Sequence, residues 1–188
     1  MGRAALFLPV VLGLGSAPAL ALEIGVEGGV VGTLQSKEPG VDSGPNPESS
    51  PLVGVVVEHS FRESAVSLDL WGDLQYPLPI STEYLDLSDY LPVDLGLRIG
   101  LVVDRLEPYL GVLGQVAFAA RPAGGANDLN PAIVGVGGDL GMDVAFWVLR
   151  AGLEARFVEV VTPIHSGPFS EEQVSEFQAL LSLRAIVF

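Results

Sequence analysis

Cysteine is missing from this 188-residue sequence, and lysine occurs only once, at Lys37. The lack of cysteine excludes disulfides, thiolate metal sites, cysteine catalysis and acylation of a lipoprotein cysteine. Nine Lys and Arg residues against 23 Asp and Glu residues give a formal net charge of −14. Because phosphate binding needs clustered cations, this balance excludes nucleic acid as an expected partner.

Long apolar runs are also missing outside the N-terminus, although 49% of the residues are hydrophobic and the mean hydropathy is +0.47. The sequence therefore predicts no membrane-spanning helix. Its apolar residues must be spread over alternating positions. Together with 23 glycines and an aromatic content of 7%, this favours many curved strands over a helical bundle. The length suits one domain.

Residues 1–21 have the pattern of a secretory signal peptide. Arg3 supplies the positive start, residues 4–14 form the apolar core, and Ala19-Leu20-Ala21 is an A-x-A cleavage site. We expect a mature domain over 22–188, with a short N-terminal anchor helix as the alternative.

The stretch 91–120 predicts a hairpin of long strands. Its odd positions from Leu91 to Val103 are all apolar, whereas its even positions include Asp94 and Arg98. This period of two indicates a strand, and the chain turns at Asp104 and Arg105. Thirteen residues span ~43 Å, or roughly 33 Å at a tilt of ~40°. Such a strand is long enough to cross the ~25 Å apolar band of an outer membrane.

The same alternation recurs in six further segments. We expect strands over 22–34, 51–61, 66–76, 134–146, 149–161 and 176–187. Long loops are expected over 35–50, 77–90, 121–131 and 162–172, with further short turns at Arg62-Glu63 and Trp147-Val148.

The last segment has an alternative, because Ser170-Glu-Glu-Gln resembles a helix capping box and predicts a helix over 171–183. The even strand count favours a strand, since seven strands would leave an unpaired edge in lipid. The predicted fold class is all-β: an eight-stranded antiparallel up-and-down transmembrane β-barrel. With a periplasmic N-terminus, every long loop lies outside the cell.

This architecture, the signal peptide and the ending Leu-Arg-Ala-Ile-Val-Phe188 resemble the small outer-membrane barrels of the OmpA transmembrane-domain and OmpX type. The resemblance covers the mature region and implies a monomer in the Gram-negative outer membrane, exported through the periplasm. It implies outer-membrane lipids and lipopolysaccharide as partners, and the barrel assembly machinery through Phe188. No peptidoglycan-binding domain is expected. Phe188 shares the parity of Arg184, so either a bulge separates them or the signal is degenerate.

The rival fold is a soluble secreted barrel of lipocalin type, which has the opposite polarity, apolar inside and polar outside. Here the polar, Gly-rich face suits the interior of a narrow barrel, and we expect Trp71, Tyr109 and Trp147 to fill it.

Catalytic, metal and cofactor sites are not expected. The pairs His59-Ser60 and His165-Ser166 are adjacent in sequence, so on a strand each would point to opposite faces and make a poor dyad for lipid A modification. Gly135, Gly137 and Gly138 precede no helix pattern, and they more simply give neighbouring side chains room. Acidic residues in the loops lack calcium-loop spacing and are expected to form a solvated anionic surface. These residues are Glu38, Asp42, Glu48, Glu83, Asp86, Asp89, Asp128, Glu171 and Glu172.

The inward face carries ten acids and four arginines, which predicts a charge network in the lumen. The acids are Glu23, Glu27, Glu58, Asp69, Asp73, Asp94, Asp139, Asp143, Glu154 and Glu176; the arginines are Arg98, Arg150, Arg156 and Arg184. A turn at Trp147-Val148 sets Asp139 opposite Arg156, the first expected pair, and Asp69 with Arg98 is the second. The candidate site is Asp69, Arg98, Asp139, Arg150, Glu154 and Arg156.

The expected function is structural: envelope integrity and display of four external loops for adhesion or recognition. The alternatives are a narrow cation-preferring pore or small-solute transporter, a rim enzyme acting on lipid A, and the lipocalin-like barrel.

Overall fold

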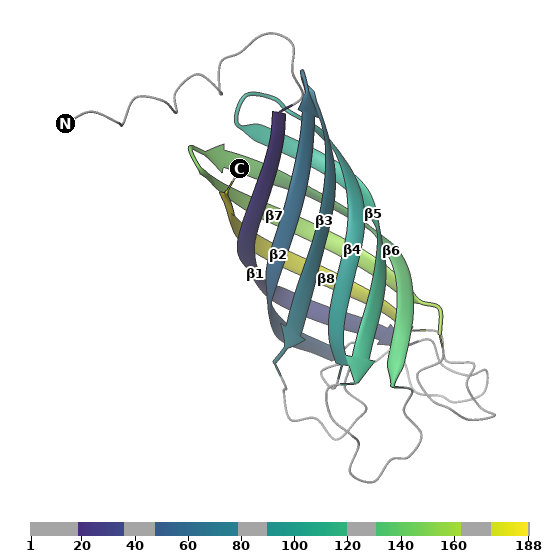
Figure 1. Ribbon diagram of the computed structural model, residues 1–188. Coiled ribbons are helices and arrows are strands. Elements are labelled where there is room, and N and C mark those ends of the chain that lie inside the picture. Colours follow the sequence, from purple (N-terminus) through teal and green to yellow (C-terminus); the bar gives the residue numbers. More distant parts are fainter. Residues whose placement is uncertain (1–18, 36–47, 79–89, 120–130, 163–173, 188) are drawn as a thin grey trace.

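The computed structural model describes residues 19–35, 48–78, 90–119, 131–162 and 174–187, which form one closed barrel of eight antiparallel strands in chain order (Figure 1). The strands are β1 (Ala19–Gln35), β2 (Glu48–Glu63), β3 (Val66–Pro77), β4 (Tyr90–Leu101), β5 (Leu106–Ala119), β6 (Ala132–Phe146), β7 (Leu149–Val160) and β8 (Val174–Ile186). The predicted fold class and strand count are confirmed. Within the described ranges, no helix is long and apolar enough to cross a membrane.

The strand register fixes the width of the barrel. One row of paired residues begins at Ile24, passes once round the wall and returns to β1 at Leu34, ten residues further along. Eight strands with this stagger tilt by about 40° and close at a backbone radius of about 8 Å. A lumen this narrow is filled by its own side chains.

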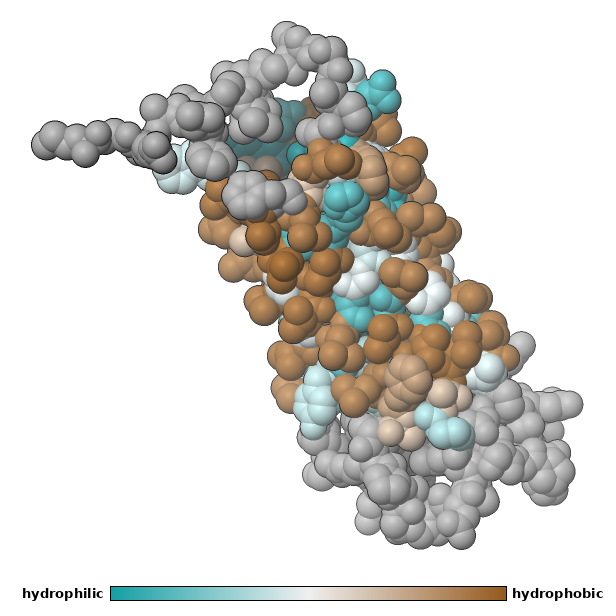
Figure 2. Space-filling view, in the orientation of Figure 1, coloured by the Kyte–Doolittle hydropathy of each residue, from teal (hydrophilic) through white to brown (hydrophobic). Residues whose placement is uncertain are grey.

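Side chains alternate between the two faces with the polarity that the sequence predicts. Along β3, Leu68, Leu70 and Leu74 are about half exposed on the outside, while Asp69 and Asp73 are buried inside. Figure 2 shows the outer wall covered mostly by hydrophobic residues. The lipocalin-like alternative is therefore wrong, because it requires an apolar interior and a polar exterior.

The short turns lie together at one end of the barrel, and two of the three have the expected position. The turns at 104–105 and 147–148 are as predicted, whereas the first lies at Ser64-Ala65, two residues beyond the expected Arg62-Glu63. Strand β2 also begins at Glu48 rather than residue 51, so it is longer at both ends. Pairing with β1 extends it, since Gly32 and Thr33 lie opposite Ser49 and Glu48.

The last strand resolves the choice between strand and helix. Residues 174–186 form β8, which pairs with β7 on one side and with β1 on the other. The helix alternative over 171–183 is wrong for residues 174–183, because closing the barrel satisfies backbone groups that an isolated edge would expose. Residues 171–173 lie outside the described residues.

Candidate functional site in the barrel lumen

The lumen holds an unusual density of buried charge. All ten expected acids and all four expected arginines point inward, and each is at most 6% exposed. Glu107 joins them at 4% exposure, which gives eleven buried acids to four buried arginines among the described residues. Burying charge is unfavourable unless it is paired, so the contacts of the arginines organise the interior.

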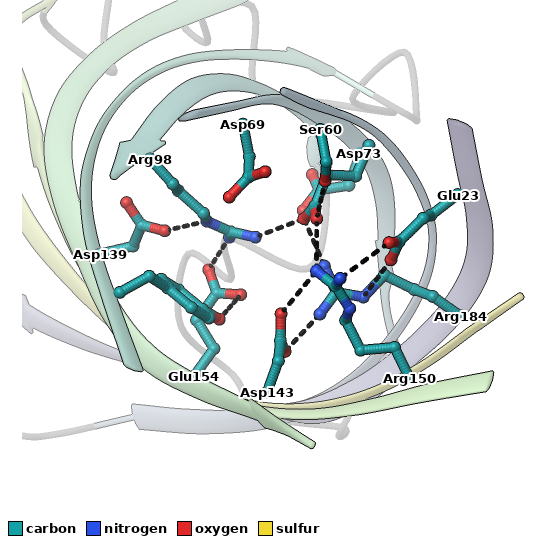
Figure 3. A network of polar contacts seen from close by, with 12 residues as sticks. Glu23, Ser60, Asp69, Asp73, Arg98, Asp139, Asp143, Arg150, Glu154 and Arg184 are labelled. Atoms are coloured by element: carbon teal, nitrogen blue, oxygen red, sulfur yellow. Dashed lines mark hydrogen bonds and ion pairs between the residues drawn. The ribbon is translucent and has the colours of Figure 1, made fainter. Parts of the chain in front are cut away.

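Arg98 of β4 lies at the middle of the lumen, where it joins strands that are not neighbours. Its guanidinium donates to Asp139 of β6, to Glu154 of β7 and, at 3.3 Å, to Glu58 of β2. Its Cζ also lies 4.0 Å from the centre of the Trp71 ring and 4.6 Å from that of Tyr109. Arg98 therefore crosses the passage rather than lining it (Figure 3).

Arg156 of β7 makes a second crossing, nearer to the long connections. It donates to Glu154 on its own strand, to Asp73 of β3, to Asp94 of β4 at 2.9 Å and to Glu27 of β1 at 3.3 Å. Its side chain is fully buried, and its Cζ lies 4.3 Å from the centre of the Trp71 ring. Trp71 thus contacts both central guanidinium groups.

Arg150 and Arg184 form a third group toward the short turns. Arg150 lies 3.2 Å from Glu23 and 3.4 Å from Glu58, and Arg184 contacts Glu58 and Asp143. Figure 3 shows these side chains converging on the barrel axis from several strands. At the turn end, a partly exposed Arg62 bonds to Glu107 at 2.6 Å.

The lumen changes character at its other end, toward the long connections. Two clusters of buried apolar residues lie there: one is formed by Tyr90, Ala117, Ile133 and Val160, the other by Val31, Leu52 and Leu180. These apolar side chains share that end with the buried Glu176 and Gln178 of β8, which bond to each other.

The register places the expected pairs opposite each other, but the ion pairs form differently. Asp139 is the cross-strand neighbour of Arg156, yet its carboxylate pairs with Arg98. Asp69 is the neighbour of Arg98, yet it accepts a hydrogen bond from Ser67 at 3.2 Å. Both expected pairs are wrong as side-chain contacts. Long arginine side chains in a narrow lumen reach past their neighbours to carboxylates across the axis.

Two charged residues of this network were absent from the predicted set. Glu107 shares the inward parity of Tyr109, so the alternation of β5 could have identified it. Arg62 was assigned to a turn, but β2 continues to Glu63 and brings Arg62 to the mouth of the lumen.

Two of the three expected aromatic fillers occupy the lumen. Trp71 and Tyr109 are buried, and glycines leave space for both: a Cβ on Gly96 would lie 2.6 Å from Trp71, and one on Gly141 would collide with Tyr109. Trp147 is not a filler. It occupies the last turn with a φ of 62° and is 92% exposed, because parity along a strand says nothing about a residue in a turn.

The histidine–serine pairs, the glycines and the acidic residues of the loops form no catalytic, phosphate or metal site within the described residues. The His59 ring lies on the outer face against Phe61, with ring centres 4.8 Å apart, whereas Ser60 is buried inside. Gly135 and Gly137 have no room for a Cβ. No group of three or more His, Asp or Glu side chains within the described strands is arranged to hold a metal ion. His165-Ser166 and most of the acidic loop residues lie outside the described residues.

No protein-family model and no curated protein matches this sequence. Among solved structures, the chain is similar to Neisserial surface protein A, with 13% identity, 89% of this chain and 98% of that chain covered, and a TM-score of 0.52. It also matches Ail, the attachment invasion locus protein of Yersinia pestis, with 11% identity, 86% and 97% coverage, and a TM-score of 0.27, too low to support an argument. The first similarity shows the fold: a small eight-stranded barrel of the outer-membrane type.

Proposed function

We propose that this protein is an integral β-barrel of the bacterial outer membrane with a structural and surface-display role. One observation carries the proposal: the outer wall is apolar while the interior is charged. Leu95, Leu110 and Leu140 are more than 60% exposed on the outer face, whereas eleven acids are buried within the described strands. In water, a protein is stabilised by apolar residues inside and charged residues outside. In a bilayer, the apolar outer wall and charged interior seen here are the favourable arrangement.

The dimensions of the outer face fit a membrane. From Val66 to Tyr76, the outward side chains of β3 are apolar or aromatic. This segment rises about 25 Å along the barrel axis at the derived tilt, which matches the apolar band of outer-membrane barrels.

Exposed aromatic residues lie toward both ends of this band. Tyr76, Phe118, Phe157 and Phe177 are toward the long connections; Phe61, Phe146 and Trp147 are toward the short turns. Such girdles mark the two interfaces of a barrel with its membrane.

Export and assembly belong to the same proposal. A signal peptide over 1–21 would direct the chain to the periplasm, and cleavage before Leu22 would remove only Ala19-Leu20-Ala21 from β1. All the pairs between β1 and β8 begin beyond that point, at Glu23. Phe188 would present the chain to the barrel assembly machinery, and the four long connections would face outward to bind lipopolysaccharide or a surface partner.

Cell fractionation with gel migration tests the proposal. The protein should partition with the outer membrane and migrate faster on a gel when unheated than after boiling, since a closed barrel resists detergent. Recovery in the soluble periplasmic fraction would contradict it. The matched variants Leu97→Arg and Gln115→Arg provide a control, because they place the same charge on the outer and the inner face.

A narrow cation-preferring passage is the second candidate function. The observation that favours it is the surplus of seven buried acids over buried arginines among the described residues. A lumen with this field attracts cations and repels anions. The crossing side chains Arg98 and Arg156 restrict the passage, so conductance in planar bilayers should be small or absent.

A further inference from the structure

The outer wall carries one carboxylate close to the long connections. Glu159 of β7 has the parity of Phe157 and Val161, which are 48% and 57% exposed, so its side chain points away from the lumen. Its paired neighbour on β6, Val136, is 52% exposed on the same face. In the described strands, the only other outward carboxylate belongs to Glu63, beside the first short turn. Glu159 is therefore an exception in a wall that is otherwise almost entirely apolar.

The strand register places Glu159 at the outer edge of the apolar band. A row of paired residues runs from Gly72 of β3 across β4, β5 and β6 to Glu159. Because these steps cover half the circumference, the row climbs by half of the ten-residue stagger, or about five residues. Tyr76, at the end of the apolar band on β3, is only about four residues beyond Gly72. Glu159 thus lies ~2–3 Å beyond Tyr76 along the barrel axis.

Ser175 of β8 holds this carboxylate in place. It is the cross-strand neighbour of Glu159, and its hydroxyl donates to Oε2 of the carboxylate at 2.6 Å. Both side chains are partly exposed. The described residues supply Glu159 with no other donor, so Oε1 can accept a hydrogen bond from a molecule outside the barrel. A carboxylate at the edge of hydrocarbon is unfavourable unless such donors meet it.

An aromatic pair lies next to this polar pair, one step deeper into the membrane. Phe157 and Phe177 are cross-strand neighbours, and each is 48% exposed. The next pair on the same face is Ala155 with Ala179. From the long connections inward, the outer face of β7 and β8 therefore presents hydrogen-bond acceptors, then two rings, then short apolar side chains.

This order of groups matches a lipid that carries hydrogen-bond donors where its headgroup joins its acyl chains. A carboxylate only accepts hydrogen bonds, so its partner must supply O–H or N–H groups. A glycerophospholipid presents ester oxygens at this depth, and these are acceptors. A lipid built on an acylated amino sugar presents amide N–H and hydroxyl groups there. The described part of the outer face places no lysine or arginine near Glu159 to bind a phosphate.

We propose that Glu159 and Ser175 bind the amide or hydroxyl groups of an outer-leaflet lipid with an N-acylated sugar headgroup. Its acyl chains pack against Phe157 and Phe177 and against the alanine pair beneath them. The inference rests on the proposed function, because it requires β7 and β8 to face the membrane with their long connections at the outer leaflet. It deepens that function by naming the lipid class and the two strands that hold it.

Native mass spectrometry of the folded barrel in detergent tests this proposal. Lipid A, which has an N-acylated glucosamine headgroup, is titrated in EDTA, and phosphatidylcholine is titrated in parallel. We expect the barrel to bind lipid A at least about tenfold more tightly, since hydrogen bonds to a charged group are strong. Equal affinity for the two lipids would overturn the inference. Binding that appears only when magnesium replaces EDTA would also overturn it, because a metal bridge to phosphate would then be the recognised group.

Two outward carboxylates provide matched variants. Glu159→Leu removes the acceptor and continues the apolar wall, so its affinity for lipid A should fall by about tenfold or more while its affinity for phosphatidylcholine stays unchanged. Glu63→Leu is the control, because it removes the other outward carboxylate at the opposite end of the wall. It should bind both lipids like the wild type. Equal affinities of Glu159→Leu and Glu63→Leu for lipid A would refute the role of this site.

Two checks keep the outcomes separate. Heat-modifiable migration shows whether each variant has folded, and Ser175→Ala gives a smaller loss in the same direction if Glu159→Leu does not fold. Cell fractionation reports the proposed function by itself. Recovery in the soluble fraction would contradict that function, whereas an outer-membrane barrel that binds both lipids equally would contradict only the lipid site.

Discussion

Removing Arg156 should destabilise the barrel more than removing any exposed charge. The side chain is fully buried, and it is the cation that Glu27, Asp73 and Asp94 contact. In Arg156→Ala these carboxylates remain buried without that partner. Breaking a buried ion pair by deleting one member costs about 3–5 kcal/mol. Loss of the contact with the Trp71 ring adds to this by about 0.5–2 kcal/mol.

The matched control is Arg62→Ala at the mouth of the lumen. Arg62 pairs with Glu107 at 2.6 Å, but its side chain is 27% exposed, and the buried Glu107 keeps Arg150 at 3.4 Å as a second cation. Its removal should cost about 0–1 kcal/mol. Adding Asp94→Asn to Arg156→Ala removes one of the stranded charges and should recover about 0.5–3 kcal/mol.

Urea unfolding in lipid vesicles measures these differences. Trp147→Phe serves as the common background, because Trp71 then remains the sole tryptophan and lies against Arg156 itself. Arg156→Ala should lose more free energy of unfolding than Arg62→Ala. If it does not, water reaches the network freely, and the prediction that the lumen is tightly packed is wrong.

Three further predictions concern the wall, the topology and the passage. Leu97→Arg should cost ~2–4 kcal/mol on the outer face, and Gln115→Arg much less beside the inward acids; equal losses in urea unfolding would mean that the faces are reversed. Trypsin added to intact cells should cut after Lys37 and should cut after Arg105 only once the envelope is opened; the opposite order would invert the topology. In planar bilayers the wild type should conduct little and prefer cations, and Arg156→Ala should conduct more; large anion-selective currents would contradict this.

The sequence by itself determined which residues face inward, because side chains alternate strictly along a strand. The parity of Asp69 and Arg98 was readable from their own strands, and the turn at 104–105 was readable from the break in alternation. The same alternation along β5 also marks Glu107 as an inward-facing residue. It failed at Trp147 because that residue belongs to a turn, where the alternation stops.

Contacts across the lumen were decided only by closing the barrel. Neighbouring strands set Asp139 opposite Arg156, but in a barrel of about 8 Å radius a guanidinium reaches strands on the far side. Arg98 of β4 therefore pairs with Glu58 of β2 and Glu154 of β7, which no local pattern links.

The junction between β3 and β4 shows the same division at the level of the backbone. Both Pro77 and Pro92 are visible in the sequence, and each alone predicts only a missing donor somewhere on its strand. Whether that donor faces one neighbour or the other depends on the phase of hydrogen bonding, which is fixed by the register of three strands together. Only the assembled sheet brings the two prolines to opposite sides of one junction, because register is a property of strand pairs and not of a strand.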